Sequence, residues 1–361
     1  MVVVRQEIWV LGAAGRIGRA VARDLGRRGH AVVLVGLDRA VLEAVAADVG
    51  GPARAEKVNG PLPELVAAIS RARPAVVVNA MGGYARNAAE IARAAMGYGG
   101  HYADLATDLE VVPRMLALSN AAAAAGSTVV TGSGFGVLGT EAVAAMLCRN
   151  RPVPDAVRVD ALPSVATAGG RMGTAFAESM VDVLVSGGRR YSGGRLVRER
   201  LGAEVVRHVT PDGTTVASAS APSGELIAAH AASGAAEVRF SSALVPTSAV
   251  VRAVAPLAGR LLSIAALRRF AVRRMAAAEL PVVPRPRPHS WGRAVVTWAD
   301  GTSRTGWLRA DDAMDFTSAV LAEVADRLIA GGAPAGAFTP AAAFGPDVAV
   351  AAGATFVLDQ P

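Results

Sequence analysis

Apolar residues follow two different periods in the first part of the chain. Short runs of consecutive apolar residues are typical of buried parallel strands, and they alternate with stretches of helical three-to-four spacing. The expected strands are residues 8–11, 31–35, 75–78 and 127–131, with 99–105 expected as a loop that leads into a further short strand, and the expected helices are 20–25, 40–49, 61–71, 88–98 and 109–125. This alternation predicts a doubly wound parallel sheet, an α/β fold of the Rossmann type.

The pattern changes after a second glycine-rich stretch, residues 132–140, which we expect to be a loop leading into a helix over 140–148. Apolar and polar residues then alternate singly, as in antiparallel strands with one covered face. These stretches are 157–162, 187–197, 204–209, 237–244 and 293–309, with helices expected over 175–185 and 311–329. The second part is therefore predicted to be an α+β domain with an open mixed sheet.

The length of 361 residues is compatible with two domains. We expect a dinucleotide-binding Rossmann domain over residues 1–135 and a substrate-binding and dimerisation domain over 136–310. The C-terminal segment 311–361 is expected to pack back on the first domain. The open sheet of the second domain predicts a homodimer formed by sheet pairing.

A glycine-rich turn follows the first expected strand. Gly12 allows the tight turn, Gly15 lets the backbone approach a diphosphate, and Gly18 lets the helix pack on the strand. The N–H groups and the dipole at the start of the helix favour an anion there. The spacing is G-x-x-G-x-x-G, so the prediction depends on the strand before the turn and the helix after it. The predicted contacts are Gly12, Ala14, Gly15, Arg16 and Ile17.

The choice of dinucleotide is expected to be made at the end of the second strand. Asp38 is placed to bind a ribose 2′-hydroxyl, as in NAD sites, whereas Arg39 is placed to bind a 2′-phosphate. Because Arg16 is a second candidate partner for that phosphate, we predict NADP, with NAD as the alternative. Asn79, Ala80 and Met81, after the 75–78 strand, are expected to border the nicotinamide.

Composition excludes several other functions. The net charge of +7 comes almost entirely from arginine, since Lys57 is the only lysine, and no basic run is interleaved with aromatic residues, so no nucleic-acid partner is expected. Cys148 is the only cysteine, which excludes a disulfide framework, and no metal site is expected. The chain lacks a Walker phosphate loop. No signal peptide precedes the first strand, so we expect a cytoplasmic protein.

Residues 250–275 are apolar and rich in arginine. The arginines recur too often for a membrane-spanning segment. A solvated amphipathic helix is the favoured interpretation, and peripheral contact with anionic lipid or with a partner is the less favoured alternative.

Two groups of polar residues are candidates for the chemistry. Tyr102 and His101 are candidate proton donors, with Asp104 beside them to orient the loop. Arg171 precedes an expected helix start, where it would bind a substrate carboxylate together with the backbone N–H groups of Gly173 and Thr174.

The order of these motifs resembles the saccharopine dehydrogenase-like (saccharopine reductase-like) oxidoreductases. The most diagnostic segment is Gly100 to Leu105, which is similar to the family's Gly-x-x-Tyr-x-Asp. Phe135 lies in another similar segment, and the resemblance makes it a candidate substrate contact. The other similar segments are 12–18, 33–42, 77–80, 134–140, 173–179 and 336–340.

The resemblance implies an NAD(P)-dependent oxidoreductase. We expect it to reduce the C=N bond of an imine in a small amino-acid-like substrate. One alternative is a trans-acting enoyl reductase that acts on a carrier-bound acyl or polyketide chain, and a second is a dinucleotide-binding scaffold or sensor without turnover. A carboxylate clamp at Arg171 would favour the imine, and a wide apolar channel lined by residues 250–267 would favour the acyl chain. The lysine–histidine pair of members that act on saccharopine has no counterpart, since the single lysine is Lys57.

Overall fold

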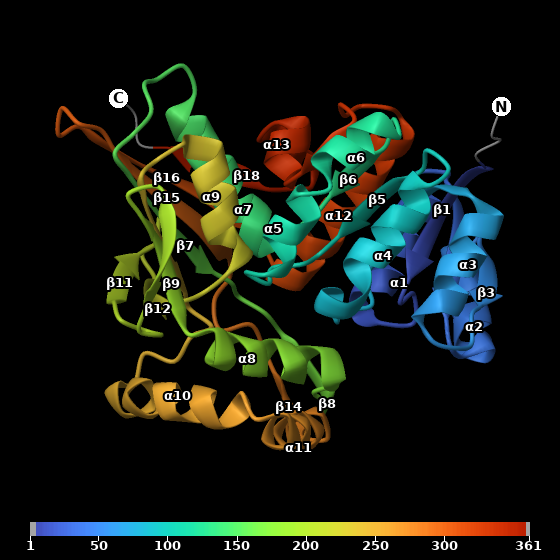
Figure 1. Ribbon diagram of the computed structural model, residues 1–361, viewed down its shortest axis with the longest axis horizontal. Coiled ribbons are helices and arrows are strands. Elements are labelled where there is room, and N and C mark those ends of the chain that lie inside the picture. The colour runs from blue at the N-terminus through green and yellow to red at the C-terminus, as the bar shows by residue number, and fades with distance from the viewer. Residues whose placement is uncertain (1–4, 359–361) are drawn as a thin grey trace. The chain divides into compact units, whose positions relative to one another are not determined.

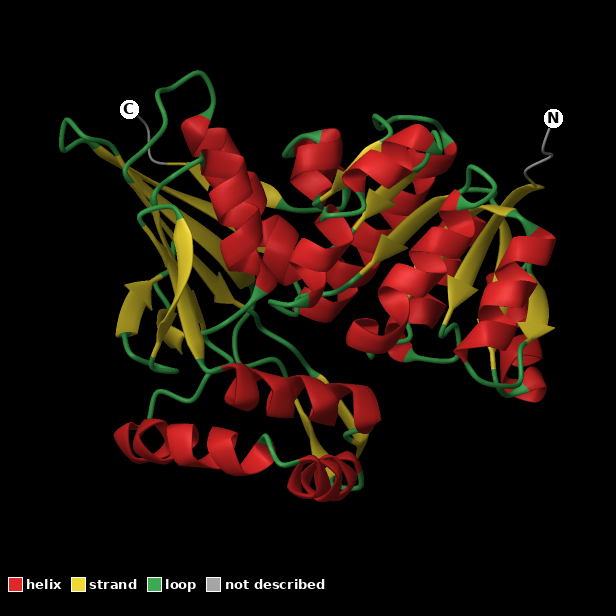
Figure 2. Cartoon of the chain, in the orientation of Figure 1, coloured by secondary structure: helices red, strands yellow, loops and turns green. Residues whose placement is uncertain are grey.

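The computed structural model describes residues 5–358, and these form two compact units. Of the described residues, the first unit comprises 5–106, 110–134 and 314–353, and the second comprises 107–109, 135–313 and 354–358. Figure 1 labels elements of both units where there is room, and Figure 2 distinguishes the helices from the strands.

The first unit is built on a parallel sheet of seven strands in the order β17-β6-β5-β4-β1-β2-β3. The strands are β1 (Arg5–Leu11), β2 (Ala31–Gly36), β3 (Arg54–Lys57), β4 (Pro74–Asn79), β5 (His101–Asp104), β6 (Thr128–Val130) and β17 (Gly336–Phe338). The helices are α1 (Arg16–Arg27), α2 (Arg39–Val49), α3 (Leu62–Ala72), α4 (Tyr84–Met96), α5 (Val111–Leu116), α6 (Ser119–Ala124), α12 (Ala313–Ile329), α13 (Pro340–Phe344) and α14 (Asp347–Ala351). The predicted Rossmann-type parallel sheet is thereby confirmed.

The strand order reverses direction beside β1. Strands β2 and β3 lie on one side of β1, whereas β4, β5 and β6 lie on the other. Leu11 at the end of β1 is therefore in register with Val35 of β2 and with Asn79 of β4. In open α/β sheets, the crevice at such a reversal is where ligands bind. Two elements differ from the sequence expectation: β3 was not predicted, and residues 109–125 form two short helices, α5 and α6, instead of one.

The second unit contains a mixed sheet in the order β10-β9-β13-β7-β15-β16-β18, with β12 paired to β13 and β11 to β12. Its strands are β7 (Ala156–Leu162), β9 (Gly188–Ser192), β10 (Arg195–Glu199), β11 (Val205–Val209), β12 (Thr215–Ser220), β13 (Glu237–Ser242), β15 (Ser290–Thr297), β16 (Ser303–Ala310) and β18 (Thr355–Leu358). The helices α7 (Phe135–Cys148) and α9 (Gly224–Ser233) pack on this sheet. The predicted second sheet of mixed direction is confirmed, since β7 pairs parallel with β13 and antiparallel with β15.

Three more helices and a separate two-stranded sheet complete the second unit. The sheet pairs β8 (Thr167–Arg171) with β14 (Glu279–Val283), and the helices are α8 (Thr174–Ser186), α10 (Ala249–Leu262) and α11 (Ala265–Ala276). The expected single helix over 250–275 is thus two helices, bent by 117° at residues 263–264. No single helix of residues 5–358 is long and apolar enough to cross a membrane, although α10 and α11 together meet the length and composition criteria.

The second glycine-rich stretch is not the loop that the sequence suggested. Helix α7 begins at Phe135, so Gly136 and Gly139 lie inside it. A Cβ atom at Gly136 would approach the carboxylate of Glu225 closer than 3.0 Å, and one at Gly292 of β15 would meet the backbone of Gly139 equally closely. These glycines therefore serve close packing of helix on strand and helix on helix, which composition does not distinguish from a flexible loop.

Candidate dinucleotide site

The glycine turn after β1 is held between the ends of two neighbouring strands. Gly12 has φ +76°, and its N–H donates to Val35 O over 3.0 Å. On the other side, Ala80 N–H donates to Leu11 O over 3.0 Å. A Cβ at Gly12 would lie 2.9 Å from Ala80 O, so both the backbone angle and the space require glycine here.

The N-terminus of α1 has the features of an anion-binding site. Gly15 is the N-cap residue, no side chain caps the helix, and the first turn contains no acidic residue. The first N–H groups of a helix have no acceptor within the helix, and together with the helix dipole they attract a negative charge. Gly15 has φ −80°, and a Cβ added at this position would have Gly12 O, at 3.3 Å, as its near neighbour. Glycine at this position therefore keeps space open next to the helix start.

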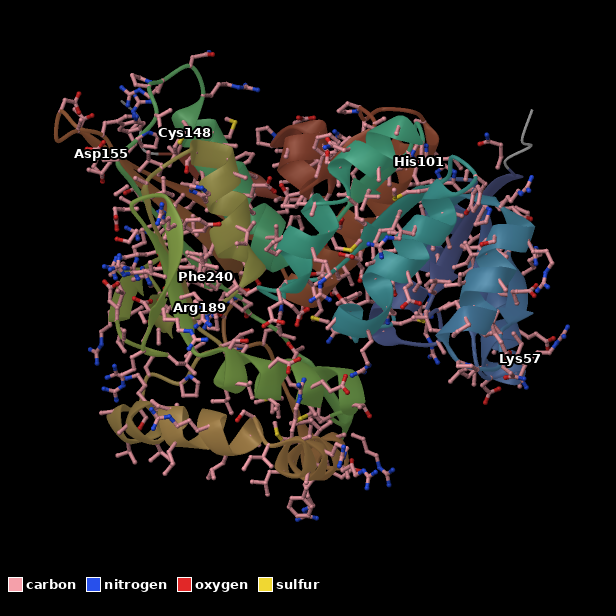
Figure 3. All side chains as sticks on the ribbon, viewed as in Figure 1. Lys57, His101, Cys148, Asp155, Arg189 and Phe240 are labelled. Carbon is pink, nitrogen blue, oxygen red and sulfur yellow. The ribbon has the colours of Figure 1, made fainter. Side chains whose placement is uncertain are left out.

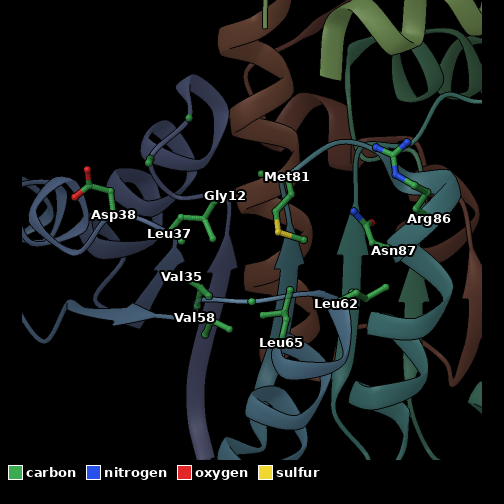
Figure 4. A pocket seen from close by; sticks show the side chains of 15 residues that line it. Gly12, Val35, Leu37, Asp38, Val58, Leu62, Leu65, Met81, Arg86 and Asn87 are labelled. Carbon is green, nitrogen blue, oxygen red and sulfur yellow. The ribbon is translucent and has the colours of Figure 1, made fainter. Parts of the chain in front are cut away.

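A pocket of about 690 Å³ opens beside this turn (Figure 4). Its walls come from the glycine turn, the end of β2, the segment from β3 into α3, and the segment from β4 into α4. The lining residues are Gly12, Ala14, Gly15, Val35, Gly36, Leu37, Asp38, Val58, Gly60, Leu62, Leu65, Ala80, Met81, Arg86 and Asn87. The pocket lies at the strand-order reversal, has mainly apolar walls, and is bordered by an uncapped helix start, which is the arrangement that a dinucleotide needs.

The structure brings six of the ten predicted cofactor contacts to this pocket. The six are Gly12, Ala14, Gly15, Asp38, Ala80 and Met81. The predicted contacts outside the lining are Arg16, Ile17, Arg39 and Asn79. Sequence reasoning missed the walls formed by Val58, Gly60, Leu62, Leu65, Arg86 and Asn87. The strand before them, β3, has the sequence Arg-Ala-Glu-Lys and lacks the apolar run that predicts a buried strand.

The charged residues expected to choose the dinucleotide already have partners within the protein. Asp38 caps α2, because its carboxylate accepts from Val41 N–H over 3.2 Å. Arg39 Nε donates to Glu43 over 2.7 Å, and this contact raises the pKa of Arg39. Arg16 lies 3.4 Å from the Asp315 carboxylate of α12. Both arginine pairs are exposed, and ion pairs of this kind are weak.

A buried chain of hydrogen bonds supports the end of β4. The amide of Asn79 donates to Tyr102 OH and to Asn87 Oδ1, each over 3.0 Å, and its oxygen accepts from Met81 N–H over 3.2 Å. Tyr102 OH in turn donates to Asp104 over 3.0 Å. Asn79, Tyr102 and Asp104 are fully buried, so the chain fixes the loop that carries Ala80 and Met81.

Both carboxylate oxygens of Asp104 accept hydrogen bonds. Its carboxylate accepts from Thr131 Oγ1 over 2.8 Å and from the N–H groups of Ala106 and Gly132. Burial raises the pKa of Asp104, although these hydrogen bonds oppose the shift. Burial also raises the pKa of Tyr102 well above its ordinary value, and the neighbouring Asp104 charge adds to this.

His101 does not join this group. It is the first residue of β5, whereas Asp104 is the last, and its Nδ1 accepts the backbone N–H of Thr128 over 3.0 Å. Burial lowers the pKa of His101. The structure therefore links two of the three predicted catalytic residues, Tyr102 and Asp104, and directs the third to the opposite end of the strand.

The predicted substrate contacts all lie in the second unit. Phe135 is buried as the first residue of α7, and Thr174 is exposed as the first residue of α8. Arg171 ends β8 and lies 3.6 Å from Glu279 of β14 in an exposed pair. The N–H of Gly173 donates to Ala276 O over 3.1 Å, so this donor is not available for the expected carboxylate clamp. Within residues 5–358, no three His, Cys, Asp or Glu side chains gather as metal ligands would.

Comparison with known proteins places these features in a family. Residues 8–130 match the family described as the saccharopine dehydrogenase NADP binding domain. This match covers about a third of the chain and assigns residues 8–130 to a saccharopine dehydrogenase-like NADP-binding domain. The cofactor of this NAD(P)-dependent enzyme is NADP by the family description, with NAD as the alternative. A search of curated protein sequences finds no match.

Among solved structures, one likeness supports this fold. An apo saccharopine dehydrogenase (L-Glu forming) from Saccharomyces cerevisiae is 12% identical, with a TM-score of 0.60 over 99% of this chain and 100% of that one. GenD2 from gentamicin A biosynthesis in complex with NAD is 15% identical, with a TM-score of 0.44 over 100% of this chain and 98% of that one. A short-chain dehydrogenase from Sphingobium yanoikuyae in complex with NADPH is 19% identical, with a TM-score of 0.28 over 35% and 71%. At such identities the first likeness describes the fold alone, and the other two are too weak to support more.

Proposed function

We propose that this oxidoreductase uses NADP(H) to reduce the C=N bond of an imine in a small amino-acid-like substrate. The observation that carries the proposal is the pocket beside the uncapped start of α1, in a unit whose sequence matches an NADP-binding family. The bound cofactor would supply the hydride, and the protein would hold it in place and control the proton.

The residues of the first unit suit each part of the dinucleotide. The diphosphate would lie against Gly15 at the start of α1, and the adenosine would lie between the end of β2 and the Val58–Leu65 segment. The exposed Arg39–Glu43 pair is weak, so a 2′-phosphate would compete with Glu43 for the guanidinium. The nicotinamide would then lie at the Asn79–Met81 loop.

The hydrogen bonds favour a positioning role for Tyr102 and Asp104. A fully buried phenol that already donates to a carboxylate is held in place and has no free proton to present to a substrate. The pair would instead keep Asn79 rigid beside the cofactor. Catalysis by Tyr102, His101 or Asp104, and substrate binding by Phe135, Arg171, Gly173 and Thr174, stay predictions.

The second unit does not favour either substrate, because the carboxylate clamp that would favour the imine lacks an expected donor: Gly173 N–H donates to Ala276 O. Most large apolar side chains of the 250–267 stretch, which were expected to line a channel in the acyl case, are exposed on α10, on α11 and at the bend between them. A homodimer formed by pairing of the exposed sheet edges, β10 or β18, also stays a prediction.

Two measurements test the proposal. Fluorescence titration with NADPH and NADH should give saturable binding with tighter affinity for NADPH. NADPH oxidation should then be measured with imines formed from amino acids and carbonyl compounds, and in parallel with enoyl thioesters. Turnover of enoyl thioesters alone would replace the imine with a C=C bond, and binding without turnover in either panel would favour the scaffold or sensor.

A further inference from the structure

The outer faces of α10 and α11 are apolar and uncovered. Seven aliphatic or aromatic side chains on these helices and at the bend between them are between 41% and 72% exposed. They are Val250, Val254, Leu257, Leu261, Ile264, Leu267 and Phe270, which we call the outer apolar row. On α10, the first four recur at intervals of four, three and four residues and so share one side of the helix. Side chains of both helices extend on the side away from α8 (Figure 3).

The inner faces of the same helices are already packed. Ala255 and Gly259 are the buried residues of α10, and a Cβ at Gly259 would meet the backbone of Leu184 in α8 closer than 3.0 Å. Val272 of α11 packs with Ala177 and Val181 of α8. The outer apolar row therefore contributes nothing to the core of this unit. A helix that is apolar on both sides is normally covered on both sides, and an exposed apolar row of this size marks an interaction surface.

The charges on this surface all have one sign. Residues 249–276 contain six arginines and no acidic residue. Two of the arginines are used within the unit, since Arg252 donates to Gly202 O and Arg268 pairs with Asp182. The other four are exposed and form no ion pair with any residue in 5–358. They are Arg260, Arg269, Arg273 and Arg274.

We propose that α10 and α11 dock this protein on an anionic lipid surface. The outer apolar row would enter the boundary between headgroups and acyl chains, and the four unpaired arginines would bind lipid phosphates while their apolar stems lie along the bilayer. This inference concerns a surface separate from the dinucleotide pocket and does not depend on the proposed reaction.

The observations favour a lipid surface over two other occupants. A second copy of the chain, placed by a two-fold axis, would bring the same arginines face to face without any acidic residue to pair them. A soluble acidic protein would complement the charge, but it would leave unexplained why seven large apolar residues lie in one row. Together α10 and α11 reach the hydropathy of membrane segments, although their 117° bend suits lying along a surface better than crossing it.

Vesicle flotation tests the proposal with the full-length protein. The protein should float with vesicles of equal parts phosphatidylglycerol and phosphatidylcholine, and it should stay behind with phosphatidylcholine alone. High salt should weaken the binding. The double variant Leu257→Gln and Leu261→Gln should lose flotation, and the α11 double variant Arg273→Gln and Arg274→Gln should bind roughly fivefold more weakly for each arginine removed.

The matched control is the double variant Arg195→Gln and Arg198→Gln, which removes exposed arginines from β10 of the same unit. It should float like the unchanged protein, and NADPH binding should be the same in every variant. Equal loss in the control and in the α11 variant would mean that only the overall charge matters, which would overturn the proposal. Absence of flotation with anionic vesicles would also overturn the proposal. So would a dimer in solution that the leucine variant dissociates. A third contrary result would be binding to soluble polyglutamate that is as tight as vesicle binding and is unchanged in the leucine variant.

Discussion

Gly15 and Gly18 stand three residues apart in one turn, yet they meet different neighbours. At Gly15 the backbone is in a conformation that any residue adopts, and this residue lines the pocket, with Gly12 O as the near neighbour of an added Cβ. At Gly18 a Cβ would meet the backbone of Gly12 and Ala13 closer than 3.0 Å. One glycine therefore preserves space for a ligand, whereas the other preserves the contact between helix and turn.

Leucine at these two positions should separate binding from folding. Gly15→Leu should weaken NADPH binding by at least about tenfold, ~1.4 kcal/mol, because its side chain occupies the space for the diphosphate, and the thermal midpoint should hardly change. Gly18→Leu should lower the free energy of unfolding by about 2 kcal/mol or more, because the backbone must move. Fluorescence titration and denaturant unfolding measure the two effects. Unchanged NADPH affinity in Gly15→Leu would remove the basis of the enzyme assignment.

Tyr102 and Tyr98 offer a matched pair of buried phenols. Tyr102→Phe removes a donor from Asp104 and an acceptor from Asn79, so it should cost about 1–2 kcal/mol of unfolding free energy. Tyr98→Phe should be neutral or stabilising, because its hydroxyl is buried without a partner in the described chain. If Tyr102 positions the cofactor loop, the variant should raise the KM for NADPH more than it lowers kcat. A large fall in kcat with unchanged KM would instead make Tyr102 the proton donor.

Glu225 gives the second unit a pH-dependent stability. Burial raises its pKa to about 7 from an ordinary value of 4.5, despite a hydrogen bond from Ser223. Between these two values the folded protein keeps a proton that the unfolded chain has released. The free energy of unfolding should therefore fall by about 3 kcal/mol as the pH rises through this window, and level off above it.

The variant Glu225→Gln should remove that dependence, because a neutral amide replaces the protonated carboxyl. The free energy of unfolding of the variant minus that of the unchanged protein, measured with denaturant, should therefore increase from pH 4.5 to 7. Glu237→Gln is the control: hydrogen bonds from Gly193 N–H and Ser192 lower the pKa of this exposed carboxyl, so its contribution is lost only below the window. A constant difference between Glu225→Gln and the unchanged protein at all pH values would show that Glu225 does not titrate in this range.

At the scale of elements, the sequence predicts those helices, strands and turns that are determined by residues close together in the chain. The strands β1, β2 and β4 each contain a continuous apolar run, and both these strands and the glycine turn after β1 were expected. Elements that depend on distant contacts were not fully predicted. Strand β3 has no apolar run, and the first part of α7 was expected to be a loop because it contains glycines, which in the structure allow distant segments to pack closely against the helix. The same distinction holds for the site, where the turn was predicted and the wall formed by Val58, Leu62 and Leu65 was not.

Helix α12 joins the first unit by charged contacts that sequence spacing does not reveal. Arg28, just after α1, contacts Glu323 over 2.6 Å and Asp326 over 2.9 Å. His30 also contacts Asp326 over 2.6 Å. Although burial raises the pKa of Asp326, the hydrogen bonds from His30 and Arg28 lower it below its ordinary value. These ion pairs are half-buried. Removing Arg28 would leave the carboxylates of Glu323 and Asp326 without their cation in a partly buried site, which lowers the stability of the folded protein.

Arg28→Met should therefore lower the free energy of unfolding by about 1–3 kcal/mol. Arg27→Met, one residue earlier, removes an exposed arginine whose partner is Asp24 of its own helix, and it should have almost no effect. Denaturant unfolding of both variants measures the difference. An equally small loss in Arg28→Met would mean that α12 is held by its apolar face alone.

At the scale of the whole molecule, the family match and the two units divide the chain differently. The matched residues, 8–130, stop short of α12, β17, α13 and α14, which complete the first unit from more than 180 residues away. Strand β17 extends the parallel sheet by pairing with β6, in register at Ala337 and Val129. Cofactor binding should therefore stabilise this C-terminal segment together with the matched domain.

Hydrogen exchange on the full chain tests that coupling. NADPH at about 100 times its dissociation constant adds ~2.7 kcal/mol to the free energy of unfolding of every segment that unfolds together with the cofactor site. Exchange by global opening of the first unit should then slow about a hundredfold, in β1 and β4 and equally in β17 and α12. The second unit's sheet should change less, and Gly15→Leu should abolish the effect. Protection confined to residues 8–130 would show that the C-terminal segment unfolds separately, because a segment that opens on its own gains nothing from a ligand bound elsewhere.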